Sequence, residues 1–149
     1  VGGGPPVDLG RNFLDGRRIF GDNKTIRGLV GGICIGTLSG IVLVWVFPLL
    51  GMATLALTDA LFLALLLSVG THIGDLFGSF IKRRMNMSPG SPAPVLDQLG
   101  FLIFALLLAY PTYPLIGVAE IIAVILLTLL IHPASNAIAY ILKLKDKPW

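Results

Sequence analysis

Long apolar segments alternate with short polar or glycine- and proline-rich segments along the chain. Four apolar segments stand out, at residues 28–47, 55–73, 95–110 and 115–131. A helix needs about 20 mostly apolar residues to cross a bilayer, and the third segment is the shortest of the four. Apolar and polar residues do not alternate strictly, as they would in a membrane barrel. The pattern therefore predicts an all-α, polytopic membrane helix bundle with four transmembrane helices, forming one domain over residues 1–149.

The basic residues indicate how this bundle lies in the membrane. All eleven fall before the first apolar segment, after the second or after the fourth. Four crossings place these three groups on one side, and the positive-inside rule makes that side cytoplasmic. We expect a multi-pass protein of the cell membrane. Residues 1–27 and the Pro/Gly loop 85–94 should lie in the cytoplasm, with a short interfacial helix around residues 13–20.

Composition narrows the class of protein further. Hydrophobic residues make up 55% of the 149 residues and charged residues 13%, whereas soluble domains are about a quarter charged. This excludes a disordered chain and a nucleic-acid-binding module. The single cysteine, Cys34, excludes a disulfide scaffold and a Cys-based zinc site.

Polar residues recur along one face of the second apolar segment and its continuation. Ser68, His72, Asp75, Ser79 and Lys82 follow one another at steps of four and three, which places them on one helical face. In lipid such a face must point into the bundle or a wet cavity. One interpretation is a functional site with its polar chemistry at the inner membrane face. The other is an internal ion pair between Asp75 and Lys82, with basic residues as membrane anchors.

The first apolar segment begins with a second candidate feature. Lys24 and Arg27 stand just before or at its start, and a helix N-terminus with basic neighbours suits a phosphate group. The run lacks the Gly-Lys-Ser/Thr ending of a phosphate-binding P-loop. Small residues then recur at every fourth position, which favours close helix packing: Gly28, Gly32, Gly36 and Gly40.

Two further polar positions lie where apolar segments meet the inner face. Asp97 opens the third segment and, together with Asp75, would suit Mg²⁺ bridging a polyphosphate. His132 and Asn136 belong to a polar stripe that leaves the fourth segment and continues to Tyr140 and Lys143. For this stripe, substrate contact and placement at the membrane interface both remain open.

Together these motifs resemble the integral-membrane CTP-dependent cytidylyltransferases that activate lipid phosphates. Ser79-Phe80-Ile81-Lys82-Arg83 matches the family's Ser-x-x-Lys-Arg run, and the stretch from Lys24 to Gly32 is similar to its Lys-Thr-x-x-Gly stretch. Residues 94–98 look like the start of its Asp-x-x-Asp segment. The short loop after Arg84, the Asp-Gln pair and the ending at residues 144–149 look most like the archaeal branch, the CDP-archaeol synthases.

The resemblance implies a reaction and its partners. Members of that branch join CTP to 2,3-bis-O-(geranylgeranyl)-sn-glycerol 1-phosphate, an isoprenoid ether lipid phosphate, and release pyrophosphate; we expect Mg²⁺ as cofactor. The bilayer is then the working environment, no nucleic acid is involved, and the glycine faces could also pair two copies as a homo-oligomer. Alternatives are a cytidylyltransferase for diacyl phosphatidate, a related polyprenol kinase, or a small channel or transporter that uses the polar stripe as its ion path.

The resemblance also implies roles for matching positions. Asp75, Lys82 and Asp97 are the expected catalytic residues, and both aspartates are the expected Mg²⁺ ligands. Substrate binding is expected of further residues, some from the motifs and some from the polar patterns: Lys24, Thr25, Arg27, Gly28, Ser79, Arg83, Gln98, His132 and Asn136. The chain departs from the family at Gly100, where the second acid of the Asp-x-x-Asp segment would stand. Relatives usually carry a hydrophobic helix before residue 1, so a fifth N-terminal helix is expected.

Overall fold

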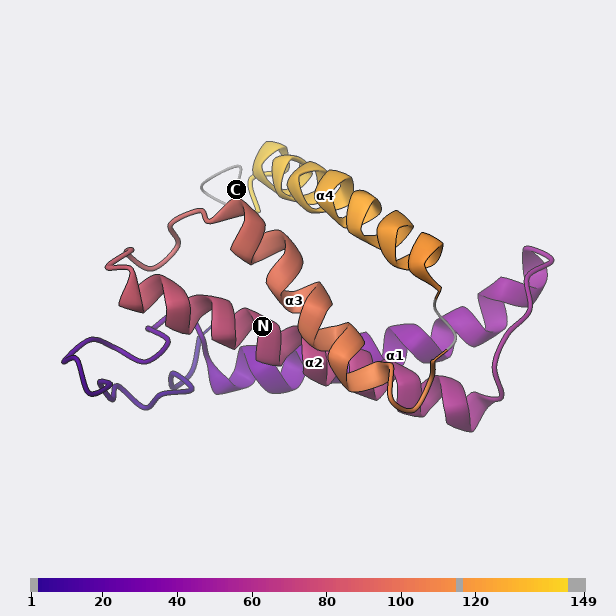
Figure 1. The fold of residues 1–149 in the computed structure, drawn as a ribbon, viewed down its shortest axis with the longest axis horizontal. Helices are drawn as coiled ribbons and strands as arrows, with labels where there is room; N and C mark the ends of the chain where they lie inside the picture. Colours follow the sequence, from indigo (N-terminus) through magenta and orange to yellow (C-terminus); the bar gives the residue numbers. More distant parts are fainter. Residues whose placement is uncertain (1–2, 115–116, 145–149) are drawn as a thin grey trace.

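The computed structural model describes residues 3–114 and 117–144, and regular structure in these ranges is helical apart from two isolated β-bridges. The helices are α1 (Ile26–Leu49), α2 (Leu57–Arg84), α3 (Pro94–Ala109) and α4 (Val118–Ile141) (Figure 1). Three of them are long and apolar enough to cross a membrane, and α3 is a shorter apolar helix. The predicted all-α membrane bundle is therefore confirmed. Residues 115 and 116 of the fourth predicted segment lie outside the described residues.

Successive helices run in alternating directions, as Figure 1 shows. The N-terminal segment, the α2–α3 loop and the C-terminal end of α4 consequently gather at one end of the molecule, and the two other connections lie at the opposite end. The gathered end carries Arg17, Lys24, Lys82, Arg84 and Lys143, and we call it the basic end. Lys145 and Lys147, of the third predicted basic group, fall outside the described residues.

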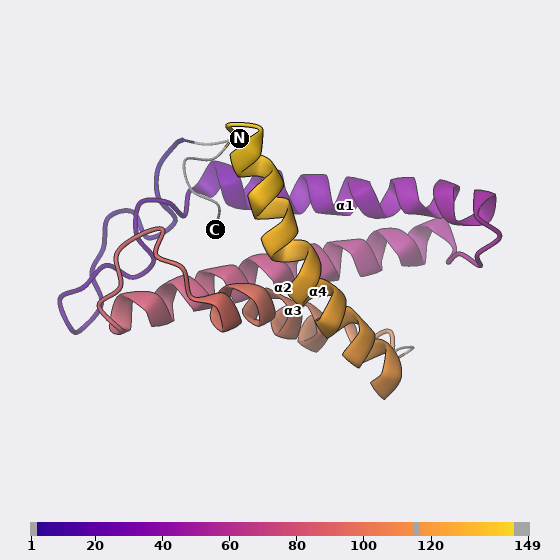
Figure 2. The same ribbon diagram turned by 90° about the horizontal axis from the view of Figure 1, so that it is seen from above.

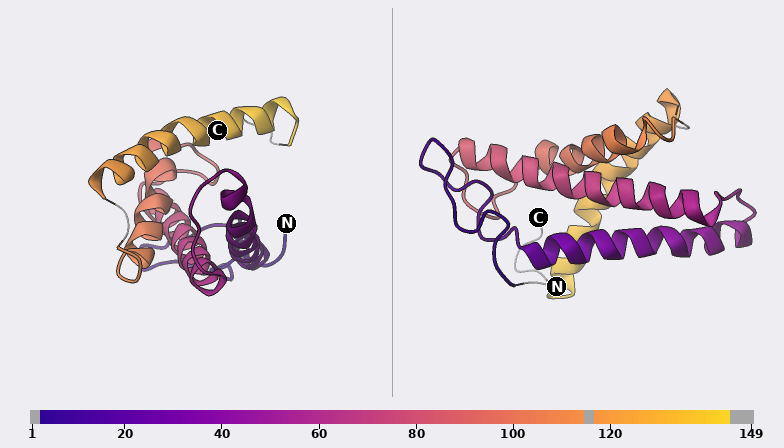
Figure 3. Two further views of the ribbon diagram at one scale, coloured as in Figure 1. Left: turned by 90° about the vertical axis from the view of Figure 1, so that its right-hand side faces the viewer. Right: turned by 90° about the horizontal axis from the view of Figure 1, so that it is seen from below.

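Helix α2 is the centre of the bundle. It packs against α1 on one side and α3 on the other, and α4 contacts α3 alone among the helices of the described chain. Figure 2 shows α1 and α2 side by side along their length, with α4 crossing the bundle steeply; Figure 3 shows the same crossing from the end. Helices α1 and α4 leave large apolar side chains uncovered, such as Trp45 and Leu130, which suits helices that face lipid.

Glycines set the close contact between α1 and α2. A Cβ atom added at any of three α1 glycines would overlap a side chain of α2. The overlapping pairs are Gly32 with His72, Gly36 with Ser68, and Gly40 with Ala64. Without a hydrophobic driving force inside lipid, helix association depends on such close van der Waals packing. The packing interpretation of these glycines is therefore confirmed.

A second pair of glycines lets α2 approach the backbone of α3. A Cβ at Gly70 would lie 2.6 Å from the Cα of Ala105, and one at Gly74 would lie 2.6 Å from the carbonyl oxygen of Gly100. Backbone atoms cannot rotate away as a side chain can, so these two positions fix how α2 and α3 cross. Gly100, the departure from the family motif, lies at this crossing.

The predicted helix around residues 13–20 is wrong. This part of the chain forms turns and an isolated bridge between Asn12 and Arg18. Gly16 and Gly21 have φ angles of +76° and +98°, which interrupt a right-handed helix. Phe13, one of the apolar residues that suggested the helix, packs against α2 instead: its ring meets the Phe80 ring edge-on, with 5.1 Å between the ring centres.

Asp8 organises the N-terminal segment in place of a helix. Its carboxylate, which is fully buried, accepts hydrogen bonds from the backbone amides of Gly10, Phe20 and Gly21 and pairs with Arg18 at 2.7 Å. Burial by itself would raise the pKa of Asp8, but the hydrogen bonds from Arg18 and the three amides outweigh it and hold that pKa well below its usual range. The segment therefore folds around one buried charge.

Candidate functional site

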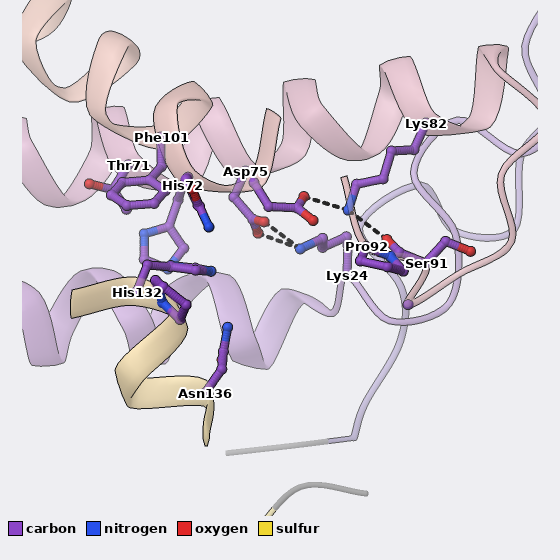
Figure 4. A pocket seen from close by; sticks show the side chains of 14 residues that line it. Lys24, Thr71, His72, Asp75, Lys82, Ser91, Pro92, Phe101, His132 and Asn136 are labelled. Atoms are coloured by element: carbon purple, nitrogen blue, oxygen red, sulfur yellow. Dashed lines mark hydrogen bonds and ion pairs between the residues drawn. The ribbon is translucent and has the colours of Figure 1, made fainter. Parts of the chain in front are cut away.

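The main polar cavity of the described chain lies at the basic end and has a volume of about 430 Å³. Its wall is formed by α2, α3, α4, the residue before the α1 cap and the α2–α3 loop (Figure 4). Ligand pockets commonly measure roughly 300–1,000 Å³, so the cavity has room for a substrate. We call it the central pocket, and it is lined by Lys24, Thr71, His72, Asp75, Lys82, Gly90, Ser91, Pro92, Asp97, Gln98, Phe101, His132, Pro133 and Asn136.

The central pocket brings together most of the expected site. All three expected catalytic residues line it, and so do four of the expected substrate-binding residues: Lys24, Gln98, His132 and Asn136. The five remaining residues do not line this pocket. They are Thr25, Arg27, Gly28, Ser79 and Arg83.

Lys24 and Asp75 form the first charged contact of the pocket. The Nζ atom of Lys24 lies 2.6 and 2.5 Å from the two carboxylate oxygens of Asp75 (Figure 4). Lys24 precedes the Thr25 cap of α1, whereas Asp75 lies in the second half of α2. This contact is possible because the glycines of α1 bring the two helices close together.

Lys82 and Asp97 form the second charged contact, at 2.5 Å between α2 and the first turn of α3. Lys82 also donates to the carbonyl oxygen of Ser91, at 3.2 Å. The other carboxylate oxygen of Asp97 accepts from the amide of Ala93, at 2.9 Å, and so satisfies a donor that the helix start would leave unpaired. The alternative of an internal ion pair between Asp75 and Lys82 is therefore wrong, because each residue has its partner on another element.

The wall opposite these charges is less polar. The rings of Phe101 in α3 and His132 in α4 stack with centroids 5.8 Å apart and planes 29° apart. His72 reaches back along its own helix, with Nδ1 2.8 Å from the carbonyl oxygen of Ser68. The second polar stripe thus divides, because His132 and Asn136 line the pocket while Tyr140 and Lys143 are exposed outside it.

The start of α1 lies beside the central pocket. The Thr25 hydroxyl accepts from the amide of Gly28 at 3.1 Å, and the amide of Ile26 donates to the carbonyl of Pro5 at 3.0 Å. These amides are already engaged, which weakens the expectation of a phosphate bound at the helix start. Thr25 and Gly28 line a smaller cavity of about 190 Å³ that shares Lys24, His72 and Asp75 with the central pocket.

Three expected residues point elsewhere. The Ser79 hydroxyl donates to the carbonyl of Asp75 in its own helix, at 2.9 Å. The side chain of Arg83 is directed to the far side of the α2–α3 loop, where it donates to the carbonyl of Ser88 at 2.9 Å. Lys82 and Arg83 are adjacent in a helix and therefore differ by about 100° in direction; Lys82 lines the central pocket and Arg83 does not. Arg27 is exposed and lines neither cavity at the start of α1.

The carboxylates of the pocket fit a hard divalent cation. Among the described residues, His, Cys, Asp and Glu form no group of three or more that could hold a metal by themselves. Mg²⁺ does not need such a group, because it commonly takes one or two protein carboxylates together with substrate phosphate oxygens and water. Asp75 and Asp97 supply two carboxylates to one cavity, which suits Mg²⁺ bound together with a phosphorylated substrate.

Several lining residues were missed from the sequence. Thr71 lies within the span of the polar stripe, four residues before Asp75, and Phe101 lies one helical turn after Asp97. The helical period could have found both of them. Ser91 and Pro92 come from a loop whose path has no periodic signal, so the sequence offered no means of placing them.

Comparison with known proteins supports a lipid-synthesising enzyme. A family model described as CarS-like, CDP-archaeol synthase, matches residues 1–149. The chain is 47% identical over 149 residues to a CDP-archaeol synthase from Pyrococcus furiosus, covering 100% of this chain and 86% of that protein. It is 51% identical over 150 residues to the one from Thermococcus kodakarensis, covering 100% and 85%.

A solved structure agrees with the sequence relatives. It is described as an intramembrane enzyme for archaeal membrane lipids biosynthesis, and it matches with a TM-score of 0.79 and 33% identity over 91% of this chain and 80% of its own. The relatives do not favour the phosphatidate, kinase or channel alternatives. Taken with the four-helix membrane fold and the charged pocket at its basic end, these matches show that the chain belongs to the CDP-archaeol synthase family.

Proposed function

We propose that the chain transfers CMP from CTP to 2,3-bis-O-(geranylgeranyl)-sn-glycerol 1-phosphate. An oxygen of the lipid phosphate forms a bond to the α-phosphorus of CTP, and the bond from that phosphorus to the oxygen bridging the β-phosphate breaks. The products are CDP-archaeol and pyrophosphate, so no protein nucleophile is needed. Membership of the CDP-archaeol synthase family supports this reaction.

The two ion pairs in one pocket are the observation that carries the assignment of residues. Lys24 and Lys82 face Asp75 and Asp97, so the four charges balance. A purely anionic ligand would be repelled by the carboxylates, and a free cation by the lysines. A nucleotide with a bound divalent cation carries both negative and positive charge. Its phosphates can replace the carboxylates as partners of the lysines, and its cation can replace the lysines as partner of the carboxylates. Preorganised charges of this kind stabilise the transition state of phosphoryl-type transfers.

Each charged residue then has a distinct role. Asp75 and Asp97 would hold Mg²⁺, which when bound neutralises charge on the triphosphate and polarises its oxygens. Lys24 and Lys82, released from the carboxylates, hold the phosphate oxygens and orient the two substrates. Because both lysines are tied to fixed elements, the substrates are positioned with little loss of freedom during the reaction.

The less polar wall suits the nucleoside. Phe101 and His132 present stacked rings, and Gln98 and Asn136 add amide groups that can donate and accept hydrogen bonds. We assign these four residues to the base and ribose of CTP. Thr25 and Gly28 act through the cap that positions Lys24, while Arg27, Ser79 and Arg83 make no direct contact with substrate.

The membrane divides the substrates between two routes. The basic end faces the cytoplasm by the positive-inside rule, so CTP reaches the central pocket from the cytosol. The isoprenoid chains stay in the bilayer, where α1 and α4 expose apolar side chains. Only the lipid phosphate needs to enter the pocket.

Transfer of label tests the proposal. The full chain in detergent receives CTP labelled at the α-phosphate, the geranylgeranyl lipid phosphate and Mg²⁺, and labelled CDP-lipid is measured. We expect product that disappears on chelation of divalent metal, and slower transfer to diacyl phosphatidate. A parallel reaction contains CTP labelled at the γ-phosphate, and label on the lipid in that reaction would indicate a kinase and contradict the proposal.

Matched variants test the metal assignment. Asp75→Asn and Asp97→Asn should each reduce transfer at least hundredfold, the size expected when one preorganised electrostatic group is lost. Asp59→Asn is the control, because Asp59 is exposed in the first turn of α2, at the opposite end. Full Mg²⁺-dependent activity in both pocket variants would rule out these ligands.

A further inference from the structure

A separate small cavity, distinct from the one at the start of α1, lies on the other side of the α2–α3 loop from the central pocket. Its volume is about 190 Å³, and arginines from two separate segments line it: Arg17 and Arg18 from the N-terminal segment and Arg83 from the end of α2. We call it the arginine pocket. Asp22 is the one acidic residue among its lining residues.

Arg83 is the unusual member of this pocket. The residue is only 8% exposed, yet among the described residues its guanidinium makes a single hydrogen bond, to the carbonyl of Ser88. Its Nε atom is buried without a hydrogen-bond partner. A buried charge without an opposite charge is costly, and a guanidinium presents a fork of donors that matches carboxylate or phosphate oxygens.

The neighbours of Arg83 differ in whether an acid balances them. Gly21 lies beside the guanidinium, and a Cβ atom there would be in ordinary contact with Pro89 and, at 3.8 Å, with Nη1 of Arg83. The guanidinium of Arg17 likewise has no acidic partner in the described chain and donates to the carbonyl of Arg84 at 2.6 Å. Arg18, in contrast, is held by Asp8 and Asp22.

From these contacts we infer that the arginine pocket is a second anion site, which binds one phosphate group. Both neighbouring acids, Asp8 and Asp22, pair with Arg18, so the positive charges of Arg17 and Arg83 are not both balanced and the group keeps a charge of +1. The guanidinium groups of Arg17 and Arg83 present forks of donors that match the oxygens of a phosphate. The volume is below the roughly 300 Å³ at which pockets for drug-sized ligands begin, so it suits a single phosphate group. The group can belong to free inorganic phosphate or to a lipid headgroup, since both present the same oxygens.

The site is separate from the central pocket but shares a structural element with it. The turn from Ser88 to Ser91 is held on one side by Arg83, at the carbonyl of Ser88, and on the other by Lys82, at the carbonyl of Ser91. The two serine hydroxyls lie 2.8 Å apart and close the turn. A phosphate on Arg83 therefore acts on the same turn that orients Lys82.

Equilibrium binding of labelled inorganic phosphate tests the site. The full chain is purified in non-ionic detergent without phospholipid, and it carries Lys24→Gln and Lys82→Gln so that the central pocket does not contribute. We expect one phosphate per chain, and Arg83→Gln or Arg17→Gln should weaken its binding at least tenfold. Arg11→Gln is the matched control, because it removes one positive charge from the same segment at an exposed position outside the pocket.

A variant that should bind phosphate more tightly distinguishes loss of the site from misfolding of the variant. Asp22→Asn removes the acid of the pocket and should tighten phosphate binding severalfold, which a damaged fold could not do. Weaker binding in Asp22→Asn, or equal binding in the Lys24→Gln/Lys82→Gln parent and in the same chain with Arg83→Gln or Arg17→Gln, would overturn the inference for free phosphate.

A second experiment, in lipid vesicles, identifies whether the bound phosphate belongs to a lipid. The same variants are placed in vesicles containing equal parts of phosphatidylglycerol and an uncharged glycolipid, then extracted and weighed by native mass spectrometry. Phosphatidylglycerol retained by the parent chain and lost in Arg83→Gln would assign a lipid headgroup, and phosphate binding without lipid retention would assign the free ion. If neither ligand depends on Arg83 and Arg17, the inference fails.

Discussion

Lys24 and Asp75 are 51 residues apart in sequence, and their side chains meet at 2.5 Å. The contact joins the segment before α1 to the second half of α2, and it stands at the edge shared by the central pocket and the smaller cavity beside it. The arrangement allows two explanations, a structural tie or a poised pair of substrate ligands, and a charge exchange separates them.

Exchanging the two charges should preserve the tie and abolish the activity. The double variant Lys24→Asp/Asp75→Lys keeps one cation and one anion in contact, so its melting temperature should stay near that of the parent. Transfer of CMP should fall about hundredfold, because each charge now faces the wrong part of the substrate. CMP transfer and thermal unfolding are measured on the same variants. If the exchanged pair keeps its activity, the contact between Lys24 and Asp75 is structural only.

The α2–α3 crossing should not tolerate a methyl group at Gly74. A Cβ there would lie 2.6 Å from a backbone oxygen, and we expect Gly74→Ala to lower stability by about 1–3 kcal/mol, the usual cost of overpacking. Gly78→Ala is the control, since its Cβ would lie 3.5 Å from the side chain of Leu96, an ordinary contact. Thermal unfolding in detergent measures both variants. Equal stability of the two would contradict the close approach of the helices.

The N-terminal segment should lose stability in acid through Asp8. Since the folded pKa of Asp8 is below its ordinary value of 3.8, its contribution is fully present above that value and is lost as pH falls from there toward the folded pKa. Hydrogen exchange of the Phe20 and Gly21 amides, corrected for intrinsic rate, should therefore accelerate below about pH 4. Asp8→Asn should remove their protection at every pH, whereas Asp15→Asn, at an exposed position, should leave it intact.

Phe13 should anchor the N-terminal segment to α2. The guanidinium of Arg84 lies 5.0 Å from the Phe13 ring centre and 4.9 Å from that of Phe80, and aromatic and cation–π contacts are worth about 1–2 kcal/mol together. Phe13→Ala should raise the rate of proteolysis within residues 8–24 about tenfold. Leu14→Ala, at the neighbouring and 96% exposed position, should not change the rate, and similar rates in both variants would exclude the anchor.

The helices and their polar face could be predicted because their signals repeat. Each apolar segment is long enough to be recognised by length, and the steps of three and four that place Asp75 and Lys82 on one face are a property of any helix. The same period also located the glycine contacts of α1. These parts of the fold follow from local sequence alone.

The remaining features depend on contacts between distant residues. Asp75 and Lys82 share a face, yet each pairs with a residue on another element, and nothing in their spacing reveals that choice. Arg83 belongs to a recognised motif, but its side chain lies on the far side of the α2–α3 loop, where it donates to the carbonyl of Ser88; the motif does not reveal that loop contact. Asp8, which organises the N-terminal segment, belongs to no periodic pattern at all.

The shortness of α3 has a consequence for how a charged nucleotide reaches a membrane enzyme. Its 16 residues rise about 24 Å, less than the roughly 30 Å of a hydrocarbon core, while α2 beside it has 28 residues. Asp97 in the first turn of α3 contacts Lys82, two residues before the end of α2, so α3 begins near the basic end of α2 and its missing length lies at the other end. The charged pocket therefore stays near the level of the headgroups, where a nucleotide can reach a lipid phosphate without the lipid leaving its leaflet.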